Sequence, residues 1–131
     1  MRKITQDSIK AFLNEDNFKR GNTEVKVSHI DENIDSNVPY KPITVITDLL
    51  LHGNIIATAT KKFINGKYET SITMDSAGWK TVTTKERLNG LLQYLNAGSI
   101  YQKNFQWFYN EQLRHGEEII IWPFHIAWNE P

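Results

Sequence analysis

Residues 43–74 read ITVITDLLLHGNIIATATKKFINGKYETSITM, and they contain the clearest β-sheet pattern of the chain. Two turn signals interrupt it, His52-Gly53-Asn54 and Asn65-Gly66. Asn-Gly is the strongest short hairpin signal, because a type I′ turn needs a positive φ at both of its central residues. The stretch therefore predicts a three-stranded antiparallel meander. Its strands are expected over residues 43–51, 55–63 and 67–74.

A short helix is predicted before the meander and a longer one after it. In the first helix Thr5 is the expected N-cap, and Ile9 and Phe12 share one face. The longer helix is expected to begin at Thr83 or Thr84, because Thr83 and Glu86 match a capping box. Its apolar stripe consists of Leu88, Leu91, Leu92 and Leu95, and Gly98 is the expected residue after its end.

Further strands are expected around these elements. Residues 24–30 alternate loosely, residues 99–109 predict a hairpin around Asn104-Phe105, and residues 118–122 predict a last strand. Residues 31–42 predict a surface loop. We therefore expect residues 1–131 to form a single α+β domain. It would have an antiparallel sheet of about five or six strands, with one principal helix packed on one face and a short N-terminal helix. The leucine stripe is expected to cover Val45, Ala57 and Ile72.

The composition narrows the class of function. Fifteen Lys and Arg residues balance fifteen Asp and Glu residues, and this balance disfavours a dedicated polyanion binder. The absence of cysteine excludes disulfides, thiolate metal sites and cysteine nucleophiles. The longest apolar runs are far shorter than the ~20 residues of a membrane-spanning helix. We expect a soluble cytoplasmic protein that does not associate with membranes.

Catalytic motifs are not apparent in the sequence. The four histidines, His29, His52, His115 and His125, show no metal-ligand spacing. The phosphate-binding loop, the dinucleotide fingerprint and the nucleophile elbow are also missing. We therefore expect a protein that is not an enzyme, with no cofactor and no bound metal.

Residues 79–89 contain most of the candidate binding residues, at the predicted N-terminus of the principal helix. A helix N-terminus with basic side chains could bind a phosphate group. The structural alternative is that Thr83 and Glu86 cap the helix, that Arg87 lies along its surface and that Trp79 fills the core. The candidates for binding a partner or nucleic acid are Trp79, Lys80, Thr84, Lys85, Arg87, Asn89 and, further along the chain, Trp107.

Two aromatic segments have alternative interpretations. The predicted hairpin over residues 101–109 is either a base-stacking surface beside Lys103 or part of the core. The apolar tail, residues 122–131, either docks on its own chain or meets another chain, for example in a homodimer. The candidate oligomer interface consists of Trp122, Phe124, Ile126 and Trp128.

Four ordered motifs, GNTEV, LHGN-IA, AGW-T-TTKERLN and QW, resemble a family of small proteins encoded mainly in bacteriophages, prophages and mobile elements. The match runs from about residue 12 to residue 116, and the tail is an addition. The resemblance implies a phage source and carries over no activity. It points to Asn22, Thr23, His52, Asn54, Trp79, Thr83, Thr84, Arg87, Asn89 and Trp107.

Three functions follow from these observations. The leading hypothesis is a non-enzymatic phage accessory protein that binds a host macromolecule, such as a host protein of antiviral defence or nucleic-acid handling. The first alternative is a nucleic-acid-binding module. The second is a protein or enzyme that binds a nucleotide-like ligand, which requires Arg87, Asn89 and His52 to meet in one pocket.

Overall fold

The computed structural model describes residues 1–30, 44–64, 66–77, 81–109, 111–112 and 119–122. Its central meander forms as the sequence predicts, from β3 (Thr44–Leu51), β4 (Asn54–Ile64) and β5 (Lys67–Met74). The φ angles of His52 and Gly53 are 52° and 78°, so both residues of the first turn have the positive φ of a type I′ turn. The second turn joins paired strand ends, and its Gly66 has φ 85°.

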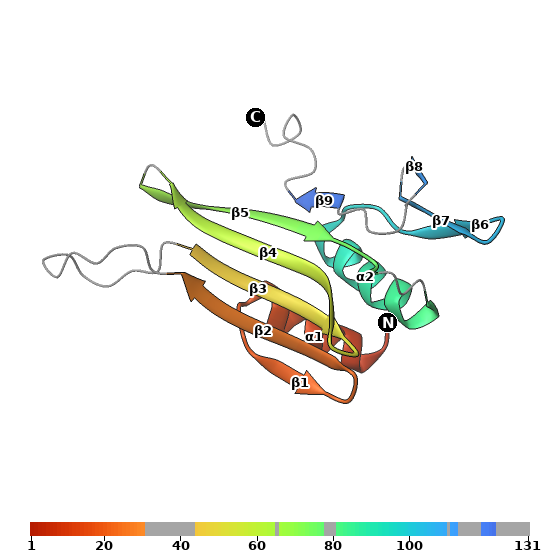
Figure 1. Ribbon diagram of the computed structural model, residues 1–131, viewed down its shortest axis with the longest axis horizontal. Coiled ribbons are helices and arrows are strands. Elements are labelled where there is room, and N and C mark those ends of the chain that lie inside the picture. Colours follow the sequence, from red (N-terminus) through yellow and green to blue (C-terminus); the bar gives the residue numbers. More distant parts are fainter. Residues whose placement is uncertain (31–43, 65, 78–80, 110, 113–118, 123–131) are drawn as a thin grey trace, which may run out of the picture.

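The meander is the centre of a six-stranded antiparallel sheet with the order β1-β2-β3-β4-β5-β9 (Figure 1). Strands β1 (Phe18–Arg20) and β2 (Thr23–Ile30) extend it on one side, and β9 (Ile119–Trp122) pairs with β5 on the other. A smaller antiparallel sheet consists of β6 (Tyr101–Lys103), β7 (Gln106–Tyr109) and β8 (Glu111–Gln112). The predicted α+β fold with a sheet of five or six strands is confirmed.

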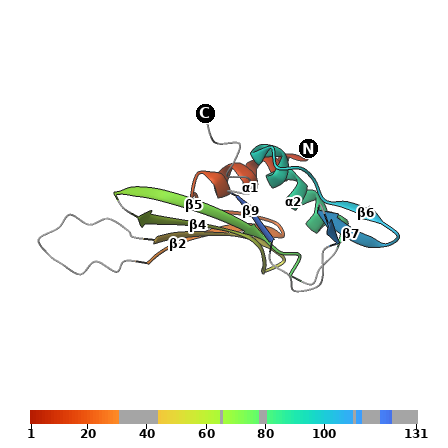
Figure 2. The same ribbon diagram turned by 90° about the horizontal axis from the view of Figure 1, so that it is seen from above.

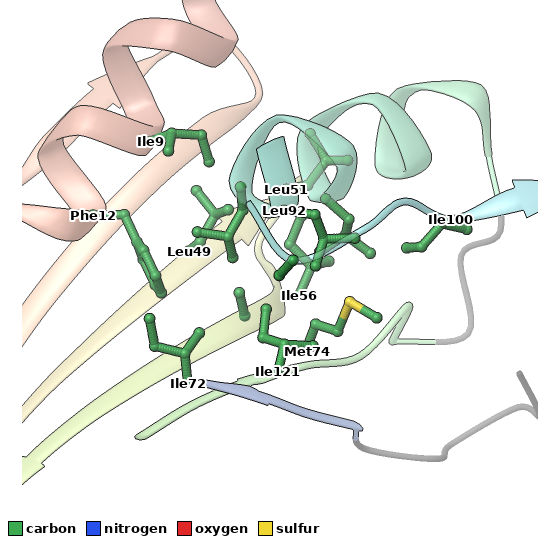
Figure 3. Close-up of a cluster of buried hydrophobic side chains, with 14 of the residues drawn as sticks. Ile9, Phe12, Leu49, Leu51, Ile56, Ile72, Met74, Leu92, Ile100 and Ile121 are labelled. Carbon is green, nitrogen blue, oxygen red and sulfur yellow. The ribbon is translucent and has the colours of Figure 1, made fainter. Parts of the chain in front are cut away.

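Two helices, α1 (Lys3–Leu13) and α2 (Val82–Leu95), lie on the same face of the large sheet (Figure 2). The core lies between the helices and the large sheet and contains side chains from both. Figure 3 shows several of them: Ile9 and Phe12 of α1, Leu92 of α2, and Leu49 of β3. Leu88, Leu91 and Leu92 are buried, as their helical spacing predicts. Ala57 and Ile72 belong to the same core cluster as these leucines, whereas Val45, although buried, is not part of this cluster.

The predicted N-terminal caps of both helices are wrong. Helix α1 begins two residues before Thr5, which is fully buried inside the helix. Helix α2 is capped by Thr81, whose side chain accepts a hydrogen bond from the Thr84 backbone N–H at 3.1 Å. Glu86 therefore does not take part in a capping box. Its carboxylate instead accepts a hydrogen bond from the Thr5 hydroxyl of α1.

The end of α2 also differs from the prediction. Asn96, not Gly98, is the residue in the left-handed conformation that follows the helix, with φ 53° and ψ 45°. Asparagine tolerates this conformation better than other non-glycine residues, because its short polar side chain bonds locally. The backbone N–H of Ala97 donates to the Leu92 carbonyl at 2.9 Å, which satisfies one of the last helical acceptors.

Some predictions concern residues that the structure does not describe. The surface loop over residues 31–42 lies outside the described residues, as do the binding candidates Trp79 and Lys80. The tail residues Phe124, Ile126 and Trp128 lie outside them as well. Trp122 ends β9 opposite Ile72 of β5, and Pro123, which has no N–H to donate, follows it in the sequence. Neither of the two described helices is long and apolar enough to cross a membrane.

Candidate functional site

The predicted binding surface at the start of α2 is largely internal. Thr84 and Arg87 are each only 1% exposed, so neither can contact a macromolecular partner. The expectation that Arg87 lies along the helix surface is wrong for the same reason. Lys85 is half-buried, and Trp79 and Lys80 are outside the described residues. Within residues 81–89, the described part of this stretch, Arg87 is buried and Lys85 is half-buried, so these two cations do not form an exposed basic surface.

Arg87 instead connects three elements inside the protein. Its Nε donates to the Thr23 hydroxyl of β2 at 3.2 Å, and its Nη1 donates to the Thr5 hydroxyl of α1 at 2.8 Å. Glu86 completes the group with an ion pair to Arg87 Nη1. A buried charge is tolerated only when it is paired and hydrogen-bonded, and Arg87 satisfies both conditions. Burial still lowers the pKa of the Arg87 guanidinium, while Glu86 opposes this shift.

This buried network reaches the turn between β3 and β4. The Thr23 hydroxyl donates to Asn22 Oδ1 at 2.8 Å, and Asn22 Nδ2 lies 3.4 Å from His52 Nε2. The backbone N–H of His52 also donates to the Asn22 carbonyl at 2.8 Å. The structure thus brings together Asn22, Thr23, His52 and Arg87, four positions to which the resemblance points, in one network that holds the fold.

Asn89 has an equally structural role. Its Nδ2 donates to the Ile100 carbonyl at 3.0 Å, and its Oδ1 accepts from the Ile100 N–H at 2.6 Å. Ile100 directly precedes β6, so Asn89 fixes the start of the small sheet against α2. Its role as a binding residue stays a prediction, while its side-chain amide already forms two hydrogen bonds within the chain.

The β6–β7 hairpin has one face in the core. Trp107 and Tyr109 are buried, and the Tyr109 hydroxyl donates to the Ala97 carbonyl at 2.6 Å. Burial raises the pKa of that hydroxyl. Trp107, one of the predicted binding residues, is only 3% exposed, and its ring packs in the core. These contacts give the hairpin a fixed base.

The opposite face of the same hairpin is turned to solvent, and of its residues only Phe108 is half-buried. Strand alternation places Gln106 and Phe108 on this face, and the register adds Tyr101 and Lys103 opposite them. The Tyr101 and Phe108 rings stack with their centroids 5.5 Å apart and their planes at 14°. Both rings lie in the hairpin for which the sequence left a base-stacking surface as one alternative, although neither is among the residues singled out for binding.

Phe105 occupies the tip of the hairpin and is 95% exposed. Its φ is 65°, and that of Asn104 is 53°, so the pair forms the two-residue turn in which both φ angles are positive. Glycine is strongly preferred where Phe105 stands, because a Cβ in this conformation meets the following carbonyl. Phe105 at the tip and the stacked pair at the base of the hairpin make up the aromatic hairpin surface: Tyr101, Phe105 and Phe108.

A pocket of about 240 Å³ lies between the β3–β4 turn and the start of α2. Its lining residues are Leu51, His52, Asn54, Ile56, Thr81, Thr83 and Thr84. Arg87 and Asn89 are absent from this lining, so Arg87, Asn89 and His52 do not meet in it as the ligand-binding hypothesis requires. Within the described ranges, no group of three or more His, Asp or Glu side chains is placed to hold a metal ion.

The fold and this surface define an α+β protein with a rigidly anchored, exposed aromatic hairpin. The chain belongs to the Kyanoviridae Gp96 protein family, a family of phage proteins whose model matches residues 1–126. The resemblance to a phage family is confirmed at this level. Neither the curated proteins nor the solved structures contain a match to the chain.

Proposed function

We propose that this phage protein is a non-enzymatic accessory protein that binds a macromolecule of the host cell through the aromatic hairpin surface. Its partner would be a factor of antiviral defence or of nucleic-acid handling in the host cytoplasm. The observation that carries the proposal is Phe105, an almost fully exposed aromatic ring in a backbone conformation that favours glycine. Folding alone does not account for such a residue, whereas binding does.

The surroundings of Phe105 support this interpretation. Binding energy in interfaces is concentrated in a few aromatic or arginine side chains, and these work best on a rigid support. Trp107, Tyr109 and the Asn89–Ile100 hydrogen bonds hold the hairpin base in place. A ring on a fixed hairpin loses little conformational freedom when a partner covers it.

The absence of enzymatic activity is part of the same proposal. Arg87 and Asn89 are the polar residues that the sequence indicates for ligand binding. Their side chains instead form hydrogen bonds within the chain. A homodimer through Trp122, Phe124, Ile126 and Trp128 stays a prediction. Its test is the molar mass in solution with and without residues 122–131.

Affinity capture from infected host cells tests the proposal. The wild-type protein is expected to retain a host macromolecule that Phe105→Gly loses, because the glycine variant keeps the turn and removes the ring. Val82→Ala is the matched control, since Val82 is also a large exposed apolar side chain, at 79%, but lies on α2. Equal retention by all three proteins, or retention of nothing above background, would contradict the proposal.

Binding of single-stranded nucleic acid is the second candidate function. It is favoured by two adjacent rings, Tyr101 and Phe108, on one exposed face beside Lys103. Fluorescence anisotropy with labelled single-stranded oligonucleotides at low ionic strength measures it directly. Affinity that falls steeply with salt supports this function, and undetectable binding at low salt removes it.

A further inference from the structure

The aromatic hairpin surface also indicates the chemical class of its partner. Resting on the binding function proposed above, we infer that the partner is a folded protein and that Phe105 enters an apolar pocket on it. Tyr101 and Phe108 would lie against the surface beside that pocket. Three features of the hairpin support this assignment over nucleic acid.

The first feature is the shape of the tip. Phe105 lies in a two-residue turn, so the chain on either side of it is as narrow as a hairpin allows. Figure 1 shows β6 and β7 projecting from the end of α2, away from the large sheet. A single exposed ring at the end of such a projection matches a concave pocket, where an anchoring side chain is fully desolvated.

The second feature is charge. Lys103 is the one charged residue among residues 101–109, and the whole chain has a formal net charge of zero. Affinity for nucleic acid rests on several cations that neutralise phosphates along the strand. A surface with one lysine and three aromatic rings matches instead the apolar centre of a protein interface.

The third feature is the geometry of the rings. Tyr101 and Phe108 stack on one another, so each ring already has one of its faces covered. A single-strand binding surface needs open ring faces on which successive bases stack. Gln106 is exposed on the same face as the two rings and can supply a hydrogen bond of a polar rim.

Site-specific photo-cross-linking in infected cells tests the inference with the full chain. Phe105 is replaced by p-benzoylphenylalanine, which keeps an aromatic ring at the tip, and Val82 is replaced by the same residue as the control. We expect an adduct from position 105 and none from position 82. The adduct should survive nuclease treatment, and mass spectrometry should map it to apolar residues of one protein.

The identified protein is then purified and titrated with the wild-type chain. Phe105→Gly is expected to weaken binding at least about thirtyfold, which is the size of effect that defines an interface hot spot. Val82→Ala should bind within about twofold of the wild type. Circular dichroism and the melting temperature of each variant verify that it is folded.

The outcomes separate this inference from the proposed function. An adduct that nuclease removes would leave the binding function standing and overturn the assignment of a protein partner. A protein adduct whose purified partner binds wild type and Phe105→Gly equally would overturn the role of the ring as an anchor. No adduct at position 105 above the level at position 82 would overturn both.

Discussion

Asn89 and Ile100 exchange two hydrogen bonds, so that a side chain of α2 completes the backbone bonding of the residue that leads into β6. Eleven residues separate them in sequence. The pair positions the aromatic hairpin surface without being part of it. This explains why an asparagine stands on a helix whose own stability does not require one.

Asn89→Ala is expected to lower the free energy of unfolding by about 2–3 kcal/mol, because it leaves two partly buried backbone groups of Ile100 without partners. Chemical denaturation measures this loss. Asn89→Asp keeps the acceptor for the Ile100 N–H but places a carboxylate oxygen against the Ile100 carbonyl, so it should also destabilise the protein. An alanine variant as stable as the wild type would show that water replaces the amide fully.

Gly90→Ala is expected to destabilise the protein by about 1–3 kcal/mol, although alanine is the better helix former by about 1 kcal/mol. A Cβ at Gly90 would overlap the Cγ2 methyl of Thr5, where α1 and α2 cross. Thr5→Ser removes this methyl and keeps the hydroxyl that Arg87 and Glu86 use.

The double variant Thr5→Ser/Gly90→Ala should therefore be more stable than the sum of the two single changes predicts. Thermal unfolding of all four proteins gives this coupling. A higher melting temperature for the single variant Gly90→Ala would contradict the close approach of the two helices at this glycine.

Glu86→Ala is expected to cost more than Arg87→Met. The alanine variant leaves the Arg87 guanidinium buried without its anion, a change worth about 3–5 kcal/mol in buried ion pairs. Arg87→Met leaves only a partly exposed carboxylate, which the Thr5 hydroxyl still contacts. Urea denaturation measures the free energy of unfolding of both single variants and of the double variant. The loss in the double variant should be well below the sum of the two single losses. The reverse order of the two single losses would disprove the assignment of Arg87 as the desolvated partner.

Tyr109→Phe is expected to lower the free energy of unfolding by about 1–2 kcal/mol at pH 7, because the Ala97 carbonyl loses its donor. The raised pKa of Tyr109 means that the folded state holds this proton more tightly than the unfolded state. The hydroxyl's contribution to the free energy of unfolding is therefore complete below pH ~10. It is lost as the pH rises through the pKa that Tyr109 has in the folded state.

The stability difference between Tyr109→Phe and the wild type should thus narrow above pH ~10. Comparing the two proteins at each pH cancels the titration of the other tyrosines and of lysine. A difference that stays constant from neutral to strongly alkaline pH would contradict burial of the Tyr109 hydroxyl.

Phe105→Gly is expected to stabilise the free protein by about 1 kcal/mol, because glycine adopts the left-handed conformation without steric cost. For a chain of this size the melting temperature should rise by about 3–5 °C. Asn104→Gly should change it less, since asparagine tolerates a positive φ. A stability gain combined with a loss of partner binding is the signature of a residue kept for function, and a fall in melting temperature would remove that argument.

Much of the fold follows from local signals in the sequence. The turn at His52-Gly53, the strand over residues 23–30 and the leucine stripe of α2 depend on φ preferences and on side-chain periodicity. These properties belong to neighbouring residues in the chain, so they can be predicted without knowledge of the tertiary structure.

The candidate site was less predictable, because its burial depends on distant contacts. Alternation places Trp107 and Phe108 on opposite faces of one strand, but only packing against α2 and the large sheet decides that Trp107 is the buried one. The turn contains a stronger signal for an exposed functional residue. Phe105 follows Asn104 at the position where type I′ turns prefer glycine.

Local preferences of neighbouring residues therefore specify both helices and most strands in their order, whereas the short strands β1 and β8 were not predicted. The tertiary structure alone decided that Arg87 is a buried tie to Thr5 and Thr23, and that Phe105 remains exposed. Arg87 and Thr5 are 82 residues apart, and no local preference specifies such a contact. It arises only when α1, α2 and β2 close around the guanidinium, because a charge removed from water must find partners wherever the fold places them.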